Sequence, residues 1–128
     1  MESSKKGRHA LVSVVDDDES VRESLPDLLK EFGFEARAFS SAEEFLSSDW
    51  ADRTGCLILD IAMPGMTGLD LQRELTLRDR KIPIIFISAQ TDGAIRARAL
   101  EEGAAGFLSK PFSDTDLLAA VNAALRTP

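Results

Sequence analysis

The 128-residue sequence is poor in the residues on which several protein classes depend, with one cysteine, one histidine and fewer basic residues (15) than acidic ones (22). The single Cys56 cannot form an intrachain disulfide, so the fold does not require an oxidising compartment. The formal net charge of -7 opposes nucleic-acid binding, because neutralising phosphates requires a surplus of Lys and Arg on one face. We therefore expect no direct nucleic-acid binding by this chain.

Long hydrophobic runs are also missing. No apolar stretch approaches the roughly 18 residues that suggest a membrane-spanning helix. Lys5, Lys6 and Arg8 imitate the basic start of a signal peptide, but the apolar run "ALVSVV" that follows is short and runs into Asp16. These features predict a cytoplasmic protein without a membrane anchor.

Short apolar runs alternate regularly with stretches of helical spacing. The apolar runs predict strands at residues 10–15, 34–39, 56–60, 82–88 and 105–109. The intervening stretches predict helices at residues 19–32, 42–46, 69–77, 95–100 and 117–125. The first, third and fourth runs are nearly continuous in hydrophobicity, as in the central strands of a parallel sheet, whereas the second alternates and suits an edge. This order predicts an α/β fold with a doubly wound parallel sheet in one domain.

The residues between these elements agree with the predicted helix ends. Ser41 and Ser113 stand where helix N-caps are expected, and Gly33 and Gly103 where helices should end. Pro26 falls inside the first predicted helix, and we expect it to kink the axis because it removes one backbone hydrogen bond.

Chemically active residues gather where the predicted strands end. Asp16 and Asp17 follow the first strand, Asp60 ends the third, Ser88 ends the fourth and Lys110 lies just beyond the fifth. Doubly wound sheets bind ligands at the carboxyl ends of their strands, so we expect these five residues to meet in one cleft. Three carboxylates so close together would raise at least one pKa unless a cation lies among them.

Magnesium is the cation that this set of ligands favours, because it takes oxygen ligands from one or two carboxylates and from phosphate. Zinc lacks its usual ligands, since His9 precedes the first strand and Cys56 begins the third at the end away from the cleft. Lys110 and Ser88 add a cation and a hydroxyl donor suited to the oxygens of a transferring phosphoryl group. With Asp60 as the nucleophile, the pattern indicates phosphoryl transfer to a carboxylate.

Four segments, "VVDDDES", "LILDIAMPGMTGLDL", "IIFISAQ" and "GFLSKPF", closely resemble in order and spacing the receiver domain of two-component response regulators. The resemblance covers residues from about 10 to 125, and "VDDDESVRESL", "MPGMTGLDL" and "SKPF" are most similar to the FixJ-type branch. It implies a flavodoxin-like (βα)5 fold with strand order 2-1-3-4-5. It also implies a receiver domain at 10–126, an N-terminal extension at 1–9 and a C-terminal end at 127–128, with the output domain absent from this chain. The sequence leaves open a stand-alone receiver and a domain of a longer regulator with a DNA-binding output.

The resemblance also implies a role for each residue of the acidic cluster. A sensor histidine kinase or phosphotransfer domain would phosphorylate Asp60, with Asp17 as the main carboxylate ligand of Mg²⁺ and Asp16 supporting the ion through water. The backbone carbonyl of Ala62 would complete the protein's share of the ligands. The chain would then be a signalling phosphoacceptor rather than an enzyme that turns over a substrate. It would catalyse only its own phosphorylation and dephosphorylation.

In the family that the sequence resembles, phosphorylation is transmitted to a distant surface. Lys110 pairs with Asp60 or the phosphoryl oxygens, and the Lys110–Pro111 peptide is usually cis. Ser88 moves toward the phosphoryl group and Phe107 follows, which changes the face formed by the fourth helix, fifth strand and fifth helix. The fourth helix and fifth strand would also mediate homodimerisation.

Several positions depart from the commonest pattern of the family. Ser88 often appears as Thr in relatives, and Phe107 often appears as Tyr, so no hydroxyl is present here to anchor the inward rotamer. The side chains at Ala62 and Gln90 occupy positions that tune access of hydrolytic water in relatives.

Four alternatives remain open from the residues alone. "DDD" also suits a solvated turn in which Asp18 caps the following helix, and "MPGMTG" suits a turn before a helix capped by Thr67. A phosphatase of the haloacid-dehalogenase kind would use the same aspartyl chemistry, but it needs an Asp where Ala62 stands. A docking module that has lost phosphorylation would keep the fold without the switch.

Overall fold

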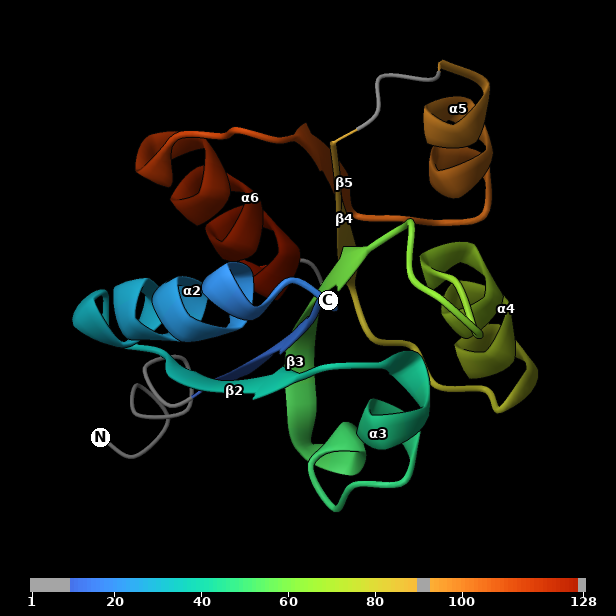
Figure 1. Ribbon diagram of the computed structural model, residues 1–128, viewed down its shortest axis with the longest axis horizontal. Coiled ribbons are helices and arrows are strands. Elements are labelled where there is room, and N and C mark those ends of the chain that lie inside the picture. The colour runs from blue at the N-terminus through green and yellow to red at the C-terminus, as the bar shows by residue number, and fades with distance from the viewer. Residues whose placement is uncertain (1–9, 90–92, 127–128) are drawn as a thin grey trace.

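Five parallel strands form one sheet in the order β2-β1-β3-β4-β5 in the computed structural model, which describes residues 10–89 and 93–126 (Figure 1). The strands are β1 (Leu11–Val15), β2 (Glu35–Phe39), β3 (Thr54–Asp60), β4 (Ile84–Ser88) and β5 (Gly106–Ser109). The helices are α2 (Glu19–Glu31), α3 (Ala42–Leu46), α4 (Gly68–Leu77), α5 (Gly93–Glu101) and α6 (Asp114–Arg126), with a short 3₁₀ helix η1 (Ala51–Arg53). The predicted fold class and strand order are confirmed.

The helices cover both faces of the sheet. Helices α2 and α6 lie on one face, and α3, α4 and α5 lie on the other (Figure 1). Successive residues of a strand point to opposite faces, so Leu57 and Leu59 pack under α3 and α4, whereas Cys56 and Ile58 pack under α2 and α6. Every residue of β1 and β4 is buried, as predicted for central strands. The alternating β2 lies at an edge, also as predicted.

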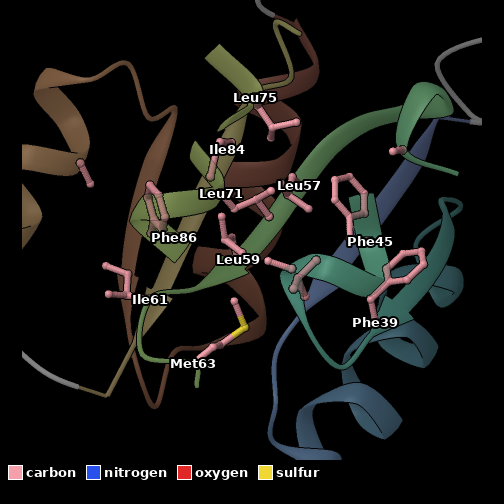
Figure 2. Packing of buried hydrophobic residues seen from close by; sticks show 14 residues of the cluster. Phe39, Phe45, Leu57, Leu59, Ile61, Met63, Leu71, Leu75, Ile84 and Phe86 are labelled. Atoms are coloured by element: carbon pink, nitrogen blue, oxygen red, sulfur yellow. The ribbon is translucent and has the colours of Figure 1, made fainter. Parts of the chain in front are cut away.

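The layer under α3, α4 and α5 contains the larger aromatic side chains (Figure 2). Phe39 of β2 and Phe45 of α3 meet edge to face with ring centroids 5.4 Å apart. Met63, three residues after the end of β3, also packs into this layer. The loop after Asp60 is therefore held by apolar contacts close to the sheet edge.

The predicted helix ends are confirmed where they were marked by specific residues. Ser41 Oγ accepts from the Glu44 N–H and Ser113 Oγ from the Asp116 N–H, each at 3.0 Å. Gly33 (φ 96°) and Gly103 (φ 102°) both adopt the left-handed backbone that ends a helix. Pro26 lies inside α2 and is buried, and the kink at this residue stays a prediction.

The observed bounds differ from the predicted ones at several element starts. β3 begins at Thr54 rather than at Cys56, because Thr54 pairs with Leu11 although it is polar. β4 begins at Ile84 rather than at residue 82, after Pro83, which has no N–H to donate. Helices α4, α5 and α6 begin before their first large apolar residue, and η1 was not predicted. Apolar spacing alone does not detect polar first turns.

None of the helices in the described ranges is long and apolar enough to cross a bilayer. The predictions for the extension at residues 1–9, which includes Lys5, Lys6, Arg8 and His9, lie outside the described residues, as do those for Gln90 and residues 127–128.

Candidate functional site

Three carboxylates meet at the carboxyl edge of the sheet. β1 and β3 are neighbours with Val15 paired to Leu59, so the residues that follow, Asp16 and Asp60, lie side by side. One oxygen from each of Asp16, Asp17 and Asp60 lies within 4.8 Å of the others. Asp16 and Asp60 are buried, whereas Asp17 is exposed. The acidic cluster predicted from the sequence is therefore present and open to solvent on one side.

The carboxyl group of Asp60 is strongly perturbed. Burial raises its pKa to about 7, and the charge of Asp16 raises it in the same direction. The charge of Lys110 and a hydrogen bond from the backbone N–H of Ala62 lower the pKa but do not compensate. Near neutral pH the proton of Asp60 is therefore easily exchanged, and in its protonated form Asp60 shares a hydrogen bond with Asp16.

Asp16 is held by donors from three directions. Its Oδ2 accepts from Lys110 Nζ at 3.0 Å, and its Oδ1 accepts from the Asp18 N–H at 2.9 Å. Arg22 on α2 donates to the backbone carbonyl of Asp16 at 3.0 Å. Burial lowers the pKa of Lys110, but its hydrogen bond to Asp16 and the charges of Asp16 and Asp60 outweigh this and raise the pKa overall. Lys110 therefore remains a cation in the cleft.

Lys110 contacts a different aspartate from the one that the resemblance implied. Its ammonium group is hydrogen-bonded to Asp16, whereas the resemblance paired it with Asp60 or with phosphoryl oxygens. Asp16 is fully buried, and the ammonium group of Lys110 lies 3.0 Å from its Oδ2, so the lysine compensates the charge of this buried carboxylate.

β4 and β5 bring Ser88 and Lys110 to the same edge. Ser88 is buried at the end of β4 and pairs with Ser109, and its carbonyl accepts from the Lys110 N–H at 2.8 Å. The Lys110–Pro111 peptide is cis. All five residues expected at the cleft thus belong to the carboxyl edge of the sheet.

The loop after Asp60 turns sharply and leads into α4. Gly65 has a φ of 74°, as a tight turn requires. Thr67 forms a capping box with Asp70, in which each side chain accepts from the other residue's N–H at 3.1 Å. Both the predicted turn and the predicted Thr67 cap are confirmed. Ala62 itself is exposed, as a residue beside an open cleft would be.

Phe107 lies on β5 between the core and the surface. It is partly buried, and its ring centroid is 6.3 Å from that of Phe86. The guanidinium carbon of Arg96 on α5 lies 5.6 Å from the centroid of the Phe107 ring, within cation–π range. Phe107 therefore contacts both the buried sheet and the exposed helix α5.

The donor set fits a hard divalent cation. It consists of carboxylate oxygens, one of them exposed, and the charge of Asp16 adds to the effect of burial in raising the pKa of Asp60. A cation among these oxygens would offset that charge. Cys56 lies four residues before Asp60 on β3, and burial raises its thiol pKa to about 12, so it is no metal ligand for this cleft. Oxygen ligands of this kind favour Mg²⁺ over Zn²⁺.

Asp18 and Arg22 have structural roles at the start of α2. Asp18 caps α2 by accepting from the Ser20 N–H at 2.9 Å, so the alternative of a capping residue in "DDD" is correct for Asp18 alone. Arg22, which supports Asp16, was not recognised from the sequence. Its only signal is its position in the first turns of a helix that begins beside the acidic cluster.

Comparisons with known proteins agree with this geometry. The family model described as the response regulator receiver domain matches residues 12–122. The transcriptional regulatory protein TdiR of Thauera aromatica is 46% identical over 125 residues, which cover 98% of this chain and 55% of TdiR. Nodulation protein W of Bradyrhizobium diazoefficiens is 50% identical over 115 residues, covering 90% of this chain and 51% of that protein. The chain therefore spans about half the length of these relatives.

Solved structures show the same fold. The response regulator StyR matches with a TM-score of 0.85 and 46% identity, covering 92% of this chain and 60% of StyR. The structure titled FixJ-N matches with a TM-score of 0.85 and 37% identity, covering 93% of this chain and 95% of that one. With a family model over most of its length and FixJ-like relatives, the chain belongs to the receiver domain family of two-component response regulators.

Proposed function

We propose that this chain is a phosphoacceptor in which Asp60 receives a phosphoryl group from the phosphohistidine of a sensor histidine kinase or phosphotransfer domain. The observation that carries the proposal is the position of Asp60, buried on a central strand beside two carboxylates and a lysine, with a pKa raised to about 7. A carboxylate oxygen of Asp60 attacks phosphorus, the P–N bond to the histidine breaks, and the histidine ring leaves with the bonding electrons.

The chain's own residues prepare and stabilise this transfer. Asp60 must be ionised to attack, and a pKa near 7 provides a substantial ionised fraction at neutral pH. Lys110, a cation already in the cleft, interacts with the incoming phosphoryl oxygens, and the Ser88 hydroxyl donates to another. The covalent product adds negative charge at the floor of the cleft, so both residues are attracted toward the phosphorylated Asp60.

We also propose Mg²⁺ as the cofactor. Asp17 and Asp60 would ligate it directly with the backbone carbonyl of Ala62, and Asp16 would act through water. When bound, the ion supplies positive charge that offsets both the carboxylates and the phosphoryl oxygens.

The switch that follows involves Ser88, Phe107 and the face formed by α5, β5 and α6. Movement of Ser88 toward the phosphoryl group opens space that Phe107 enters, which changes this face for an output domain or partner. We propose that phosphorylation promotes homodimerisation through α5 and β5. Sedimentation with and without beryllofluoride tests this, and an unchanged monomer contradicts it.

The setting of the domain completes the proposal. The receiver domain spans residues 10–126 and works in the cytoplasm as a signalling module whose only reactions are its own phosphorylation and dephosphorylation. Matched relatives include transcriptional regulators about twice as long as this chain, so DNA contact would come from another domain. A turnover phosphatase is disfavoured because Ala62 stands where that chemistry needs a second aspartate.

Intact mass measurement after incubation with acetyl phosphate tests the central step. We expect a gain of one phosphoryl group that requires Mg²⁺ and is abolished in Asp60→Asn. Asp49→Asn, at an exposed aspartate away from the cleft, is the matched control and should label like the wild type. A persistent label in Asp60→Asn would contradict the assignment. No label together with no beryllofluoride response would favour the docking module.

A further inference from the structure

The carboxyl-terminal end of helix α5 is hydrogen-bonded to helix α4. Gln72 of α4 donates from Nε2 to the backbone carbonyl of Ala99, in the last turn of α5, at 3.2 Å. Both residues are buried, with Gln72 only 3% exposed. The Ala104 N–H donates to the same carbonyl at 3.1 Å, so both acceptor positions of that oxygen are used. This carbonyl therefore joins α4, α5 and the start of the loop to β5.

The amino-terminal end of α4 is in turn attached to the phosphoacceptor. The Gly68 N–H donates to the Ile61 carbonyl at 3.0 Å. A Cβ at Gly68 would collide with the carbonyl oxygen of Asp60, so the helix begins directly against that backbone. The capping box of Thr67 and Asp70 fixes the first turn. Gln72 lies about one turn further along α4 and so has a defined position relative to Asp60.

The amide of Gln72 is only half satisfied. Its Oε1 is buried and has no hydrogen-bond partner among the described residues. A methionine of similar length would fill the same space without burying an unpaired acceptor. The bond from Nε2 to Ala99 is thus the one polar contact by which the structure explains a glutamine at this buried position.

Two ion pairs add to the contacts at this end of α5. Arg73 of α4 lies 3.8 Å from Glu102, directly after α5, and Arg98 of α5 lies 3.8 Å from the same carboxylate. By contrast, Gly93 and Arg96 in the amino-terminal half of α5 are exposed, and Ile95 is only partly buried against the core. The carboxyl-terminal end of α5 is therefore bonded to a buried side chain of α4, whereas the amino-terminal half lies closer to solvent.

We propose that Gln72 is a positioning residue that pins the carboxyl-terminal end of α5 to α4, so that the switch moves the amino-terminal half of α5 about this fixed point. The inference rests on the proposed function, because the movement is driven by phosphorylation of Asp60. Arg96 belongs to the half that moves and lies over the ring of Phe107, whereas Ala99 belongs to the half that is fixed.

The test combines amide spectra and hydrogen exchange with the labelling assay. Gln72→Met removes the donor while keeping the length of the side chain. Thr76→Val is the matched control, one turn further along α4, since its hydroxyl donates to the backbone carbonyl of Gln72 within the same helix at 3.1 Å and leaves the Gln72 amide untouched. Each protein is examined with Mg²⁺ and beryllofluoride, and acetyl phosphate labelling is measured in parallel.

In the wild type we expect beryllofluoride to shift the amides of residues 94–97 more than those of residues 99–104. Gln72→Met should keep its labelling but exchange the Ala104 amide about fivefold to tenfold faster, the effect of losing one buried hydrogen bond. Its beryllofluoride shifts should extend through residues 99–104. Thr76→Val should behave like the wild type.

Two results would overturn the proposal. One is a wild type in which the carboxyl-terminal end of α5 shifts as much as the amino-terminal end, a result that needs no variant to fold. The other is a folded Gln72→Met with unchanged exchange and an unchanged shift pattern. If the wild type neither labels nor responds to beryllofluoride, the proposed function fails, and the exchange comparison still decides whether Gln72 pins α5.

Discussion

Strands β1 and β3 bury polar side chains in two places, and the two places are built differently. Within the sheet, Ser13 and Thr54 hydroxyls lie 2.7 Å apart, and Thr54 Oγ1 donates to the Trp50 carbonyl at 2.8 Å. At the carboxyl edge, Asp16 and Asp60 lie together with one lysine, and burial together with the charge of Asp16 raises the pKa of Asp60 to about 7. The first place contains neutral, hydrogen-bonded hydroxyl groups, whereas in the second place two carboxyl groups repel each other when both are ionised.

The difference shows which group of polar residues serves the structure and which serves chemistry. Hydroxyl groups stabilise a buried position at little cost once each donor has an acceptor. Buried like charges are destabilising unless a cation or reaction makes use of them, and perturbed pKa values concentrate at functional sites. The predictions below separate the two places by stability, pH and ligand response.

The largest effect on stability is expected for Lys110→Met at the carboxyl edge. The variant leaves Asp16, which is fully buried, without its cation, so we expect the free energy of unfolding to fall by about 2–3 kcal/mol. Urea unfolding at pH 7 measures the change. Lys81→Met, at an exposed lysine, is the control and should be neutral. Equal loss in both variants would mean that the ion pair contributes nothing specific.

Gly68→Ala tests whether the carboxyl edge also depends on close backbone approach. Its Cβ would collide with the carbonyl of Asp60, so we expect a loss of about 2 kcal/mol together with weaker phosphoryl labelling. Gly93→Ala is the matched control, because nothing lies within 4 Å of its added Cβ and alanine favours a helix. If Gly68→Ala is as stable as Gly93→Ala, the contact is easily relaxed.

The pH dependence of stability should differ between wild type and Asp60→Asn. The folded pKa of Asp60 is about 7, above the value of about 3.9 expected when unfolded, so the folded state binds this proton more tightly. Its stabilising contribution is present below pH ~4 and is lost as the pH rises through ~7.

Urea unfolding from pH 5 to pH 8 measures this difference. We expect Asp60→Asn to gain about 1–2 kcal/mol relative to the wild type over this range, allowing for screening at the solvent-facing side of the cleft. Added Mg²⁺ should stabilise the wild type and narrow the gap at pH 8. A difference that stays constant with pH would contradict the raised pKa.

The smallest effect is expected for Ser13→Ala, within the neutral pair. The variant loses one buried hydrogen bond, so we expect a cost of about 1 kcal/mol that does not change between pH 5 and 8. Phosphoryl labelling should be unaffected. Ser24→Ala, which removes an exposed bond within α2, is the control and should be nearly neutral. A labelling defect in Ser13→Ala would show that the two places are coupled.

The fold class and the residues of the acidic cluster could be predicted from the amino-acid sequence, and the strand order could be predicted from its family resemblance. These follow from local patterns, because apolar runs, helical spacing and turn residues report on nearest neighbours along the chain. Parallel strands place their carboxyl ends at one edge of the sheet, so the sequence was enough to group Asp16, Asp17, Asp60, Ser88 and Lys110 in one cleft. Ser41, Thr67 and Gly33 could be recognised because helix ends favour particular residue types.

How these residues interact depends on the folded molecule and could not be predicted from the sequence. Lys110 is hydrogen-bonded to Asp16 and not to Asp60. This pairing depends on burial and on the distances between charges, which the spacing of residues along the sequence does not reveal. The Gln72 contact joins residues 27 positions apart, and on sequence alone a glutamine in an amphipathic helix is simply polar. The strength of a charge interaction and the partners of a long-range hydrogen bond depend on distances and burial in the folded molecule, because they join residues that are far apart in the sequence.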